Sequence, residues 1–228
     1  MDIQVKSKKR VADYGEVFTN PREVNAMLDL VKQETERIES RFLEPACGTG
    51  NFLVEILRRK LAAAKRRYKR SPSDYERMSF IAVTSIYGVE LLQDNVDECR
   101  ERLFEIWDSE YKAICKKECN DECREAVRYV LAKNILCGNA RSLLKVDKNG
   151  EDIHDEPLIF AEWSPLMNGM IKRRDFRLDE LVREQSDSRQ MTLDSDRHLE
   201  YSESENAFIP VPVHESDPTF YRKVQEND

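Results

Sequence analysis

A glycine-containing turn between an apolar segment and a helix-forming segment is the strongest chemical signal in the sequence. The turn lies within Phe42–Phe52 and places Gly48 and Gly50 on either side of one threonine. Glycine has no Cβ and readily adopts positive φ, so the backbone can bend sharply and approach a ligand closely. The amides at the start of the following helix then face that ligand. This pattern is typical of a loop that holds a nucleotide-type cofactor, although glycines also make ordinary strand-to-helix turns.

A carboxylate follows the second apolar segment, Ile86–Glu90. An acid at the end of a strand can accept hydrogen bonds from both hydroxyls of a ribose, as it does in dinucleotide-binding folds. Glu90 lies further from the glycines than the roughly 20 residues of that pattern, because a helix from Asn51 and a break at Ser71–Asp74 intervene. The turn and the acid together favour a nucleotide site, with an exposed strand-end acid as the alternative.

Glu44–Gly50 resembles the S-adenosylmethionine loop of the adenine-N6 DNA methyltransferases, which include the methylation subunits of restriction-modification systems. Upstream, Tyr14–Pro21 is similar to the family's Gly-x-x-aromatic-Thr-Pro element, with Asn20 inserted between the threonine and the proline. Downstream, Asn134–Ala140 looks like the third strand of the family and its adenine-contacting turn. The resemblance covers residues 11–176, and its first half is specific.

The resemblance implies S-adenosylmethionine as the cofactor and indicates which residues would bind it. In the family, the aromatic residue and the threonine enclose the methionine end of the cofactor, and the acid before the glycines contacts the same end. Asn139 stands where the family usually has Asp, and its amide can still donate to and accept from the adenine edge. Phe18 and Thr19 could instead only fix the entry to the first helix. The implied cofactor-binding residues are Phe18, Thr19, Glu44, Pro45, Ala46, Gly48, Gly50, Asn51, Glu90 and Asn139.

The resemblance also implies a catalytic turn at the end of the fourth strand, within Leu158–Met167. The family has an Asn/Asp/Ser-Pro-Pro-aromatic turn that accepts hydrogen bonds from the target amine and stacks a ring on the flipped base. Such a turn acts by positioning and electrostatics. Ser164 and Pro165 match two positions, but Leu and Met replace the second proline and the aromatic residue. A second register places Glu162 and Trp163 at the site. Neither register completes the motif. Trp163 is equally well explained as a core residue.

Hydrophobic periodicity indicates the elements that must position these residues. Strands and helices alternate, which predicts an α/β protein with a doubly wound, mainly parallel sheet of the Rossmann-like methyltransferase type. The predicted strands are Arg41–Glu44, Ile81–Val89, Asn134–Cys137 and Pro157–Trp163, with a polar loop at Val146–Asp155. The predicted helices are Arg22–Glu39, Asn51–Tyr68, Leu91–Trp107 and Ser109–Ala132.

Composition bounds the class of protein and its partners. The chain has 40% hydrophobic and 36% charged residues, which favours a soluble globular protein over a disordered chain. No apolar run approaches the roughly 18 residues of a membrane span, and the amino terminus lacks the apolar core of a signal peptide, so we expect a cytoplasmic protein. The net charge of -7 disfavours a tight DNA binder acting alone. Basic clusters at residues 58–70 and Lys172–Arg174 are either solvated cations or a surface for nucleic acid or a partner.

The sequence divides at residue 183. Residues 1–182 are predicted to form the S-adenosylmethionine-binding methyltransferase-like domain, and residues 183–228 an acidic tail or interaction arm. Within the arm, Ala207–Val213 has the character of an edge strand because two prolines remove hydrogen-bond donors. A stripe of Cys115, Cys119 and Cys123 on one helix is also expected, and it has no fourth ligand to complete a metal site.

These observations predict an S-adenosylmethionine-dependent adenine-N6 DNA methyltransferase, or its methylation subunit, from a restriction-modification or defence system. The expected partners are DNA and a specificity, nuclease or other restriction-modification subunit, with no membrane and no metal. Two alternatives remain open. One is a cofactor-binding subunit that needs a partner for catalysis, and the other is a methyltransferase that acts on a substrate other than DNA.

Overall fold

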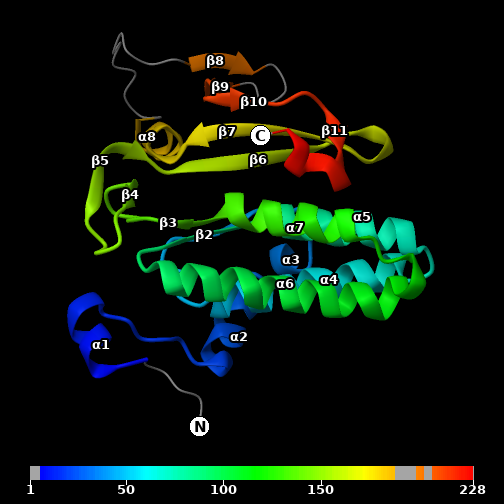
Figure 1. Cartoon of the computed structure of the whole chain (residues 1–228), viewed down its shortest axis with the longest axis horizontal. Coiled ribbons are helices and arrows are strands. Elements are labelled where there is room, and N and C mark those ends of the chain that lie inside the picture. The colour runs from blue at the N-terminus through cyan, green and yellow to red at the C-terminus, as the bar shows by residue number, and fades with distance from the viewer. Residues whose placement is uncertain (1–5, 188–198, 203–206, 228) are drawn as a thin grey trace.

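Three short parallel strands form the central sheet of the protein (Figure 1). The computed structural model describes residues 6–187, 199–202 and 207–227. The strands lie in the order β1-β2-β3, and their bounds are Phe42–Glu44, Ile86–Glu90 and Ile135–Cys137. Both pairings are parallel, with Glu44 opposite Gly88 and Glu90 opposite Cys137. The carboxyl ends of the strands therefore meet at one edge of a mixed α/β structure, as the sequence predicts.

The longest helices pack side by side and supply most of the core (Figure 1). Their bounds are α4 Asn51–Tyr68, α5 Pro72–Thr84, α6 Gln93–Cys115 and α7 Asp121–Asn134. Apolar side chains recur on the inward stripe of each helix and are buried there, as Leu57, Phe80, Leu103 and Val127 show. Trp107 of α6 stacks on Tyr111 with ring centroids 4.7 Å apart. These contacts hold the helices that connect the strands, and so fix the relative positions of the three strand ends.

The predicted fourth strand forms, but it does not join the parallel sheet. Strand β6, Ile159–Pro165, pairs antiparallel with β7, Met170–Arg177, and short strands β10 (His214–Glu215) and β11 (Thr219–Phe220) also pair with β7. The short turn η2, Met167–Gly169, reverses the chain with positive φ at its last two residues. A hairpin brings the next strand alongside at once, whereas a parallel neighbour requires a long crossover.

The second sheet packs on the first through a tyrosine. Tyr87 of β2 donates its hydroxyl hydrogen to the carbonyl of Ala161 at 3.0 Å, and its ring meets Phe160 edge to face. Beyond β3, strands β4 (Leu144–Val146) and β5 (Asp152–Pro157) form a hairpin where the sequence predicts a polar loop. Figure 1 shows this hairpin at the same end of the molecule as helix α1, Lys8–Tyr14, which the sequence did not indicate.

Several predicted element boundaries are wrong. Helix α5 continues to Thr84, so β2 starts later than expected, and the first predicted helix is divided into α2 (Pro21–Asp29) and α3 (Lys32–Thr35). The predicted cysteine stripe does not lie on one helix. Helix α6 ends at Cys115, the 3₁₀ turn η1 (Lys116–Glu118) follows with φ of 50° at its first residue, and Asn120 caps α7. The three cysteines therefore lie on two helices and the turn between them.

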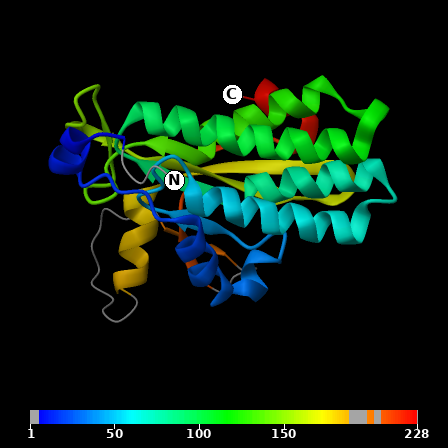
Figure 2. The same cartoon turned by 90° about the horizontal axis from the view of Figure 1, so that it is seen from below.

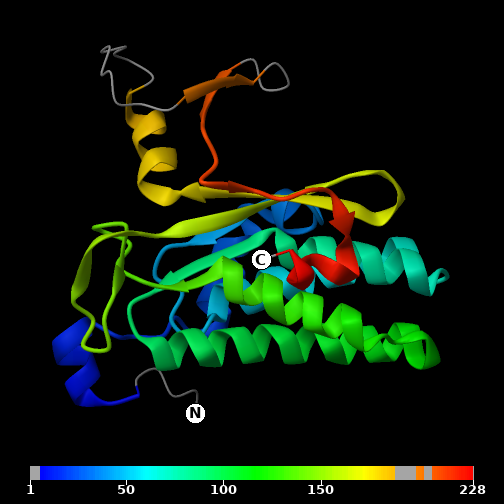
Figure 3. The ribbon, with the colours of Figure 1, turned by 45° about the horizontal axis from the view of Figure 1, so that its top comes forward.

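The end of the chain is packed against the helices (Figure 3). In the 3₁₀ segment η3, Tyr221–Glu226, the first residue is buried and donates its hydroxyl hydrogen to Glu76 of α5. Arg222 donates to the same carboxylate at 2.6 Å. Helix α8, Leu178–Asp187, crosses the predicted boundary at residue 183, and strands β8 (Leu199–Ser202) and β9 (Ala207–Pro210) pair with each other. The division of the chain into a domain and an arm stays a prediction, and part of the arm lies outside the described residues.

Candidate functional site

A cavity of about 350 Å³ opens at the carboxyl ends of the three parallel strands. In open α/β sheets this is the position at which ligands bind. All of the predicted cofactor-binding residues line the cavity except Gly50, which lies directly behind the lining. Figure 2 shows that α1 lies at this end of the molecule. The lining segments are Gly15–Thr19, Glu44–Gly48, Asn51–Phe52, Glu90–Leu92 and Gly138–Arg141.

The glycine turn has the backbone conformation that the sequence predicts. Gly48 has φ of 53° and Gly50 has φ of 89°, and the helix α4 begins at the next residue. A Cβ added to Gly50 would lie 2.6 Å from the Sγ atom of Cys99, and one added to Gly48 would lie 3.3 Å from the ring of Phe18. Both positions therefore need glycine for its backbone conformation, and Gly50 also needs it for space.

Glu90 is the central acceptor of the cavity. Its Oε2 accepts a hydrogen bond from the amide of Gly48 at 2.9 Å, which joins the end of β2 to the glycine turn. Its Oε1 accepts from the amide of Leu92 at 3.1 Å and from the side-chain amide of Asn95 at 3.2 Å. A carboxylate has about four lone-pair sites, so the three bonds orient the group and leave capacity for a ligand hydroxyl.

An arginine that sequence reasoning missed holds the glycine turn from outside the cavity. Nη1 of Arg102, on α6, donates to the carbonyl of Thr49 at 2.5 Å, to its hydroxyl at 2.9 Å and to Oδ1 of Asn51 at 3.0 Å. Asn51 in turn donates its Nδ2 hydrogen to the carbonyl of Thr19 at 3.0 Å. Asn51 thus bridges two lining segments. No local pattern marks Arg102, because it is one of many charged residues on its helix.

Glu44 brings a second carboxylate to the cavity wall. Burial raises the pKa of Glu44 above its usual value, although a hydrogen bond from the amide of Ala46 opposes that shift. A half-buried carboxylate of this kind is stabilised when a cationic group binds next to it. Glu44 is the last residue of β1, and Glu90 is the last residue of β2. The cavity therefore has one acid at the carboxyl end of each of these two neighbouring strands.

Asn139 lies at the opposite wall, and its side chain is used within the protein. Its Nδ2 donates to Asp152 at 2.9 Å, and its Oδ1 accepts from the amide of Arg141 at 3.0 Å. These bonds fix the turn between β3 and β4. One amide hydrogen and one lone pair of the oxygen remain, so Asn139 can still donate to and accept from a bound ring.

None of the four predicted catalytic residues lines the cavity. Trp163 is 3% exposed and donates its ring N–H to Asn134 at 2.9 Å, so it is a core residue. Glu162 lies between two guanidinium groups, of Arg41 at 2.6 Å and of Arg174 at 2.6 Å. In a strand, alternate side chains point to opposite faces, and the inward face of β6 buries the tryptophan.

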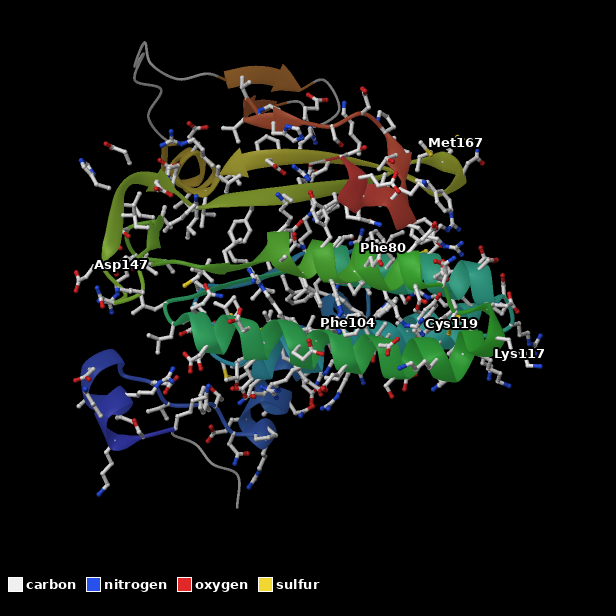
Figure 4. The ribbon with its side chains drawn as sticks, viewed as in Figure 1. Phe80, Phe104, Lys117, Cys119, Asp147 and Met167 are labelled. Atoms are coloured by element: carbon white, nitrogen blue, oxygen red, sulfur yellow. The ribbon has the colours of Figure 1, made fainter. Side chains whose placement is uncertain are left out.

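Ser164 and Pro165 continue β6 as a strand and do not form a turn. They lie next to the hairpin tip, where Figure 4 labels Met167, at the opposite end of the molecule from Asp147 of the β4–β5 hairpin. The β4–β5 hairpin and α1 are at the cavity end. The predicted catalytic turn therefore does not form within the described residues, because β6 pairs along its length with β7 and runs away from the cavity.

The basic clusters are only partly engaged in internal contacts, since Arg58, Arg66, Arg67, Lys69 and Arg70 of the first cluster are exposed. Lys60 is buried, and its ammonium donates to the carbonyls of residues 37, 38 and 40 and to the hydroxyl of Ser85. Burial lowers the pKa of Lys60 to about 7. In the second cluster, Lys172 pairs with Glu215, and Arg173 with Asp175. These three cations stabilise the fold. For the exposed cations of the first cluster, a solvated helix end and a surface for nucleic acid or a partner both stay predictions.

The cysteines lie in the packed interior and at its margin. Burial raises the pKa of Cys115 to about 12 and also raises that of Cys119. High thiol pKa values oppose thiolate formation, which both metal binding and nucleophilic attack require. Among the described residues there is no group of three or more potential ligands that could hold a metal ion. That the protein contains no stoichiometric metal stays a prediction.

The family model for the MmeI DNA-methyltransferase domain matches residues 17–156. The chain belongs to this family. The matched region begins at the Phe-Thr segment and ends in β5, so it contains almost the whole cavity lining. The match confirms the resemblance to the methyltransferases of restriction-modification systems. No curated protein and no solved structure matches the chain. Within the described residues, no helix is both long enough and apolar enough to span a membrane.

Proposed function

We propose that this restriction-modification methyltransferase domain binds S-adenosylmethionine in the cavity and serves the N6 methylation of adenine in DNA. The observation that carries the proposal is the joint geometry of the glycine turn and Glu90, which are hydrogen-bonded to each other at the carboxyl ends of parallel strands. Family membership supplies the reaction class. Because the proposed substrate is DNA, we place the protein in the cytoplasm.

The residues present fit this cofactor in size and chemistry. A cavity of about 350 Å³ lies within the range of about 300–1,000 Å³ that is typical of small-molecule sites. Glu90 can accept from ribose hydroxyls, and Leu91 and Leu92 offer apolar surface beside it. At the other end, Glu44 and the ring of Phe18 can receive the cationic methionine part, by charge and by cation–π attraction.

S-adenosylmethionine, when bound, supplies an electrophilic methyl group on a positively charged sulfur. The residues of the chain would orient it and exclude water on three sides. Glu90 would fix the ribose, the glycine turn would allow close approach of the backbone, and Glu44 would balance the positive charge. These roles lower the entropic cost of bringing the methyl group to its acceptor, and none of them requires a proton transfer.

We further propose that the parallel sheet is part of a doubly wound Rossmann-like sheet. In such sheets the strand order is 3-2-1-4, and a fourth strand joins the free edge of the first. Strand β1 is an edge strand here, with Leu43 49% exposed, and no described strand pairs with that edge. A strand of a partner chain at this edge would complete the sheet.

A second candidate is a cofactor-binding subunit that needs a partner to bind and methylate its target. One observation favours it: the four predicted catalytic residues, Glu162 to Pro165, lie away from the cavity, and the described part of the cavity lining contains no acceptor turn. A specificity, nuclease or other restriction-modification subunit would supply that turn and the recognition of DNA. This candidate shares the cofactor site with the first and differs only in the source of the catalytic groups.

Titration calorimetry with S-adenosylmethionine and S-adenosylhomocysteine tests the cofactor site. We expect one site, and Glu90→Ala should weaken binding by about 1.5–3 kcal/mol, because a charged acceptor is lost. Glu105→Ala, which removes an exposed carboxylate of α6, is the matched control and should bind as the unmodified protein does. Absence of binding by the unmodified protein, or full affinity in Glu90→Ala, would contradict the proposal.

A methylation assay separates the two candidates. The protein is incubated with tritiated S-adenosylmethionine and genomic DNA that lacks N6-methyladenine, with and without the products of neighbouring genes. The first candidate predicts N6-methyladenine with the protein alone, and the second predicts it only when the partner is added. Methyl transfer to RNA or protein in place of DNA would argue for the non-DNA alternative.

A further inference from the structure

Residues 6–16 include the short helix α1, and their last two residues, Gly15 and Glu16, line the cavity. They are held to the start of helix α6 by charged groups. Lys6 Nζ lies 2.8 Å from a carboxylate oxygen of Glu98, and Arg10 makes two hydrogen bonds to Asp94, at 2.6 and 3.1 Å. Arg10 also pairs with Glu16, at 2.8 Å. The first three contacts connect this segment to α6, the helix that follows β2, and the fourth lies within the segment.

Apolar burial contributes little to this attachment. No described apolar side chain between residues 6 and 17 is buried, and Val11 of α1 is only half-buried. Ion pairs at partly exposed positions contribute roughly 0.2–1 kcal/mol each and are screened by salt. The position of the segment on α6 therefore depends on polar contacts more than on apolar burial.

One buried side chain joins this segment to the central carboxylate of the cavity. Asn95 is 0% exposed. Its Nδ2 donates to Glu16 at 2.6 Å and to Glu90 at 3.2 Å, and its Oδ1 accepts from Lys6 at 2.7 Å. The amide thus bonds to two residues of the segment and to the acid at the end of β2. Displacement of residues 6–16 removes two of the three hydrogen-bond partners of Asn95. The loss of partners by a buried amide costs free energy.

We propose that Asn95 is a positioning residue that couples ligand binding at Glu90 to closure of residues 6–16 over the cavity. The proposal rests on the proposed function, because it requires a ligand that bonds to Glu90. A ligand hydroxyl that orients Glu90 also orients the amide of Asn95, which then holds Glu16. Coupling of this kind is reciprocal, so closure of the segment strengthens ligand binding by the same factor.

Hydrogen exchange detected by mass spectrometry tests the coupling on the full chain, with S-adenosylhomocysteine as the ligand. In the unmodified protein, the ligand should slow amide exchange in residues 6–16 as well as in the glycine turn. In Asn95→Ala, saturating ligand should still protect the glycine turn but should no longer protect residues 6–16. Gln93→Ala, which changes an exposed residue two positions away on the same helix, is the matched control and should behave as the unmodified protein.

Arg10→Gln tests the same coupling by changing a residue of the segment and leaving Asn95 and Glu90 unchanged. It removes the charge that binds Asp94 and Glu16, so we expect the dissociation rate of the ligand to rise about 3- to 10-fold. Raising the salt concentration should increase the rate in the unmodified protein and change it less in the variant. Lys9→Gln, at an exposed position one residue earlier, is the control.

The outcomes separate this inference from the proposed function. Protection of residues 6–16 that is lost in Asn95→Ala supports the coupling. Ligand binding without protection of residues 6–16 in the unmodified protein overturns the inference and leaves the cofactor site intact. Equal protection in the unmodified protein and in Asn95→Ala also overturns it, since a merely structural residue behaves in that way. Absence of ligand binding by the unmodified protein overturns both proposals together.

Discussion

Replacement of Gly50 by alanine is expected to destabilise the protein by an amount that can be worked out from two separate effects. The residue has φ of 89°, and an alanine in a left-handed conformation costs roughly 1–2 kcal/mol. The new Cβ would also lie 2.6 Å from the Sγ atom and 3.5 Å from the Cβ atom of Cys99. Overpacking of this kind costs roughly 1–3 kcal/mol, because α4 or α6 must shift. Together the two effects predict a loss of roughly 2–5 kcal/mol.

Two further variants separate the effects. Gly15→Ala also places alanine at positive φ, of 66°, but nothing lies within 4 Å of its Cβ, so it should cost only about 1–2 kcal/mol. Cys99→Ala removes the atom that Gly50→Ala would meet. In a double-mutant cycle the two substitutions should therefore show a favourable coupling of about 1–3 kcal/mol.

Urea unfolding measured by circular dichroism gives the free energies, and calorimetry with S-adenosylhomocysteine reports the ligand site. Gly50→Ala should lose both stability and affinity, whereas Gly15→Ala should lose less stability. The reasoning is refuted if Gly50→Ala and Gly15→Ala are equally stable, because the contact with Cys99 then has no cost. It is also refuted if the double-mutant cycle shows no coupling.

Three other predictions concern buried charges. Lys60→Met should destabilise the protein by about 3 kcal/mol or more, and Arg58→Met, on the exposed face of the same helix, by much less. Burial lowers the pKa of Lys60 to about 7, so the unfolded state binds more protons than the folded state between pH 7 and about 10.5. Across this window, the stability of the unmodified protein relative to Lys60→Met should therefore rise with pH. Urea unfolding at several pH values measures this difference. Burial raises the pKa of the Glu44 carboxyl group above its usual value near 4.5. The contribution of Glu44 to stability should therefore fall as the pH rises from 4.5 towards the raised pKa, and Glu44→Gln should remove this pH dependence. In calorimetry, the affinity for the cationic cofactor should rise with pH over the same interval and should not do so in Glu44→Gln. Glu76→Gln should lower the unfolding free energy by about 3 kcal/mol, because the buried carboxylate binds two tyrosine hydroxyls and an arginine, whereas Glu122→Gln at an exposed position should change it little.

The parts of the site that could be predicted from the sequence are those with local conformational requirements. Gly48 and Gly50 indicate positive φ, and the acid Glu90 ends an apolar run whose second half forms the strand β2. The order of these segments along the chain is enough to bring them together, because parallel strands joined by helices place their carboxyl ends at one edge. The region that matches the methyltransferase domain family, residues 17–156, contains these segments.

The catalytic assignment could not be predicted, because it depended on which partner β6 would find. The alternation of apolar residues indicates a strand at Ile159–Pro165, but the same alternation suits a parallel or an antiparallel neighbour. The short turn at Asn168 and Gly169 brings β7 alongside first, and this pairing carries Ser164 away from the cavity. The tryptophan beside it is consequently buried in the core.

What the sequence by itself determined about this protein is the family and the segments that line the cavity, since those depend on short segments whose conformation is set by their own residues. Only the tertiary structure decided which distant side chains hold that cavity in shape. Arg102 and Asn95 lie on α6, far along the chain from Thr49 and Glu16 respectively, and each is one polar residue among many on a charged helix. Their roles arise because the packing of α6 buries Asn95 and half-buries Arg102 beside backbone and carboxylate groups that need partners, and such hydrogen bonds depend on three-dimensional proximity that no local pattern records.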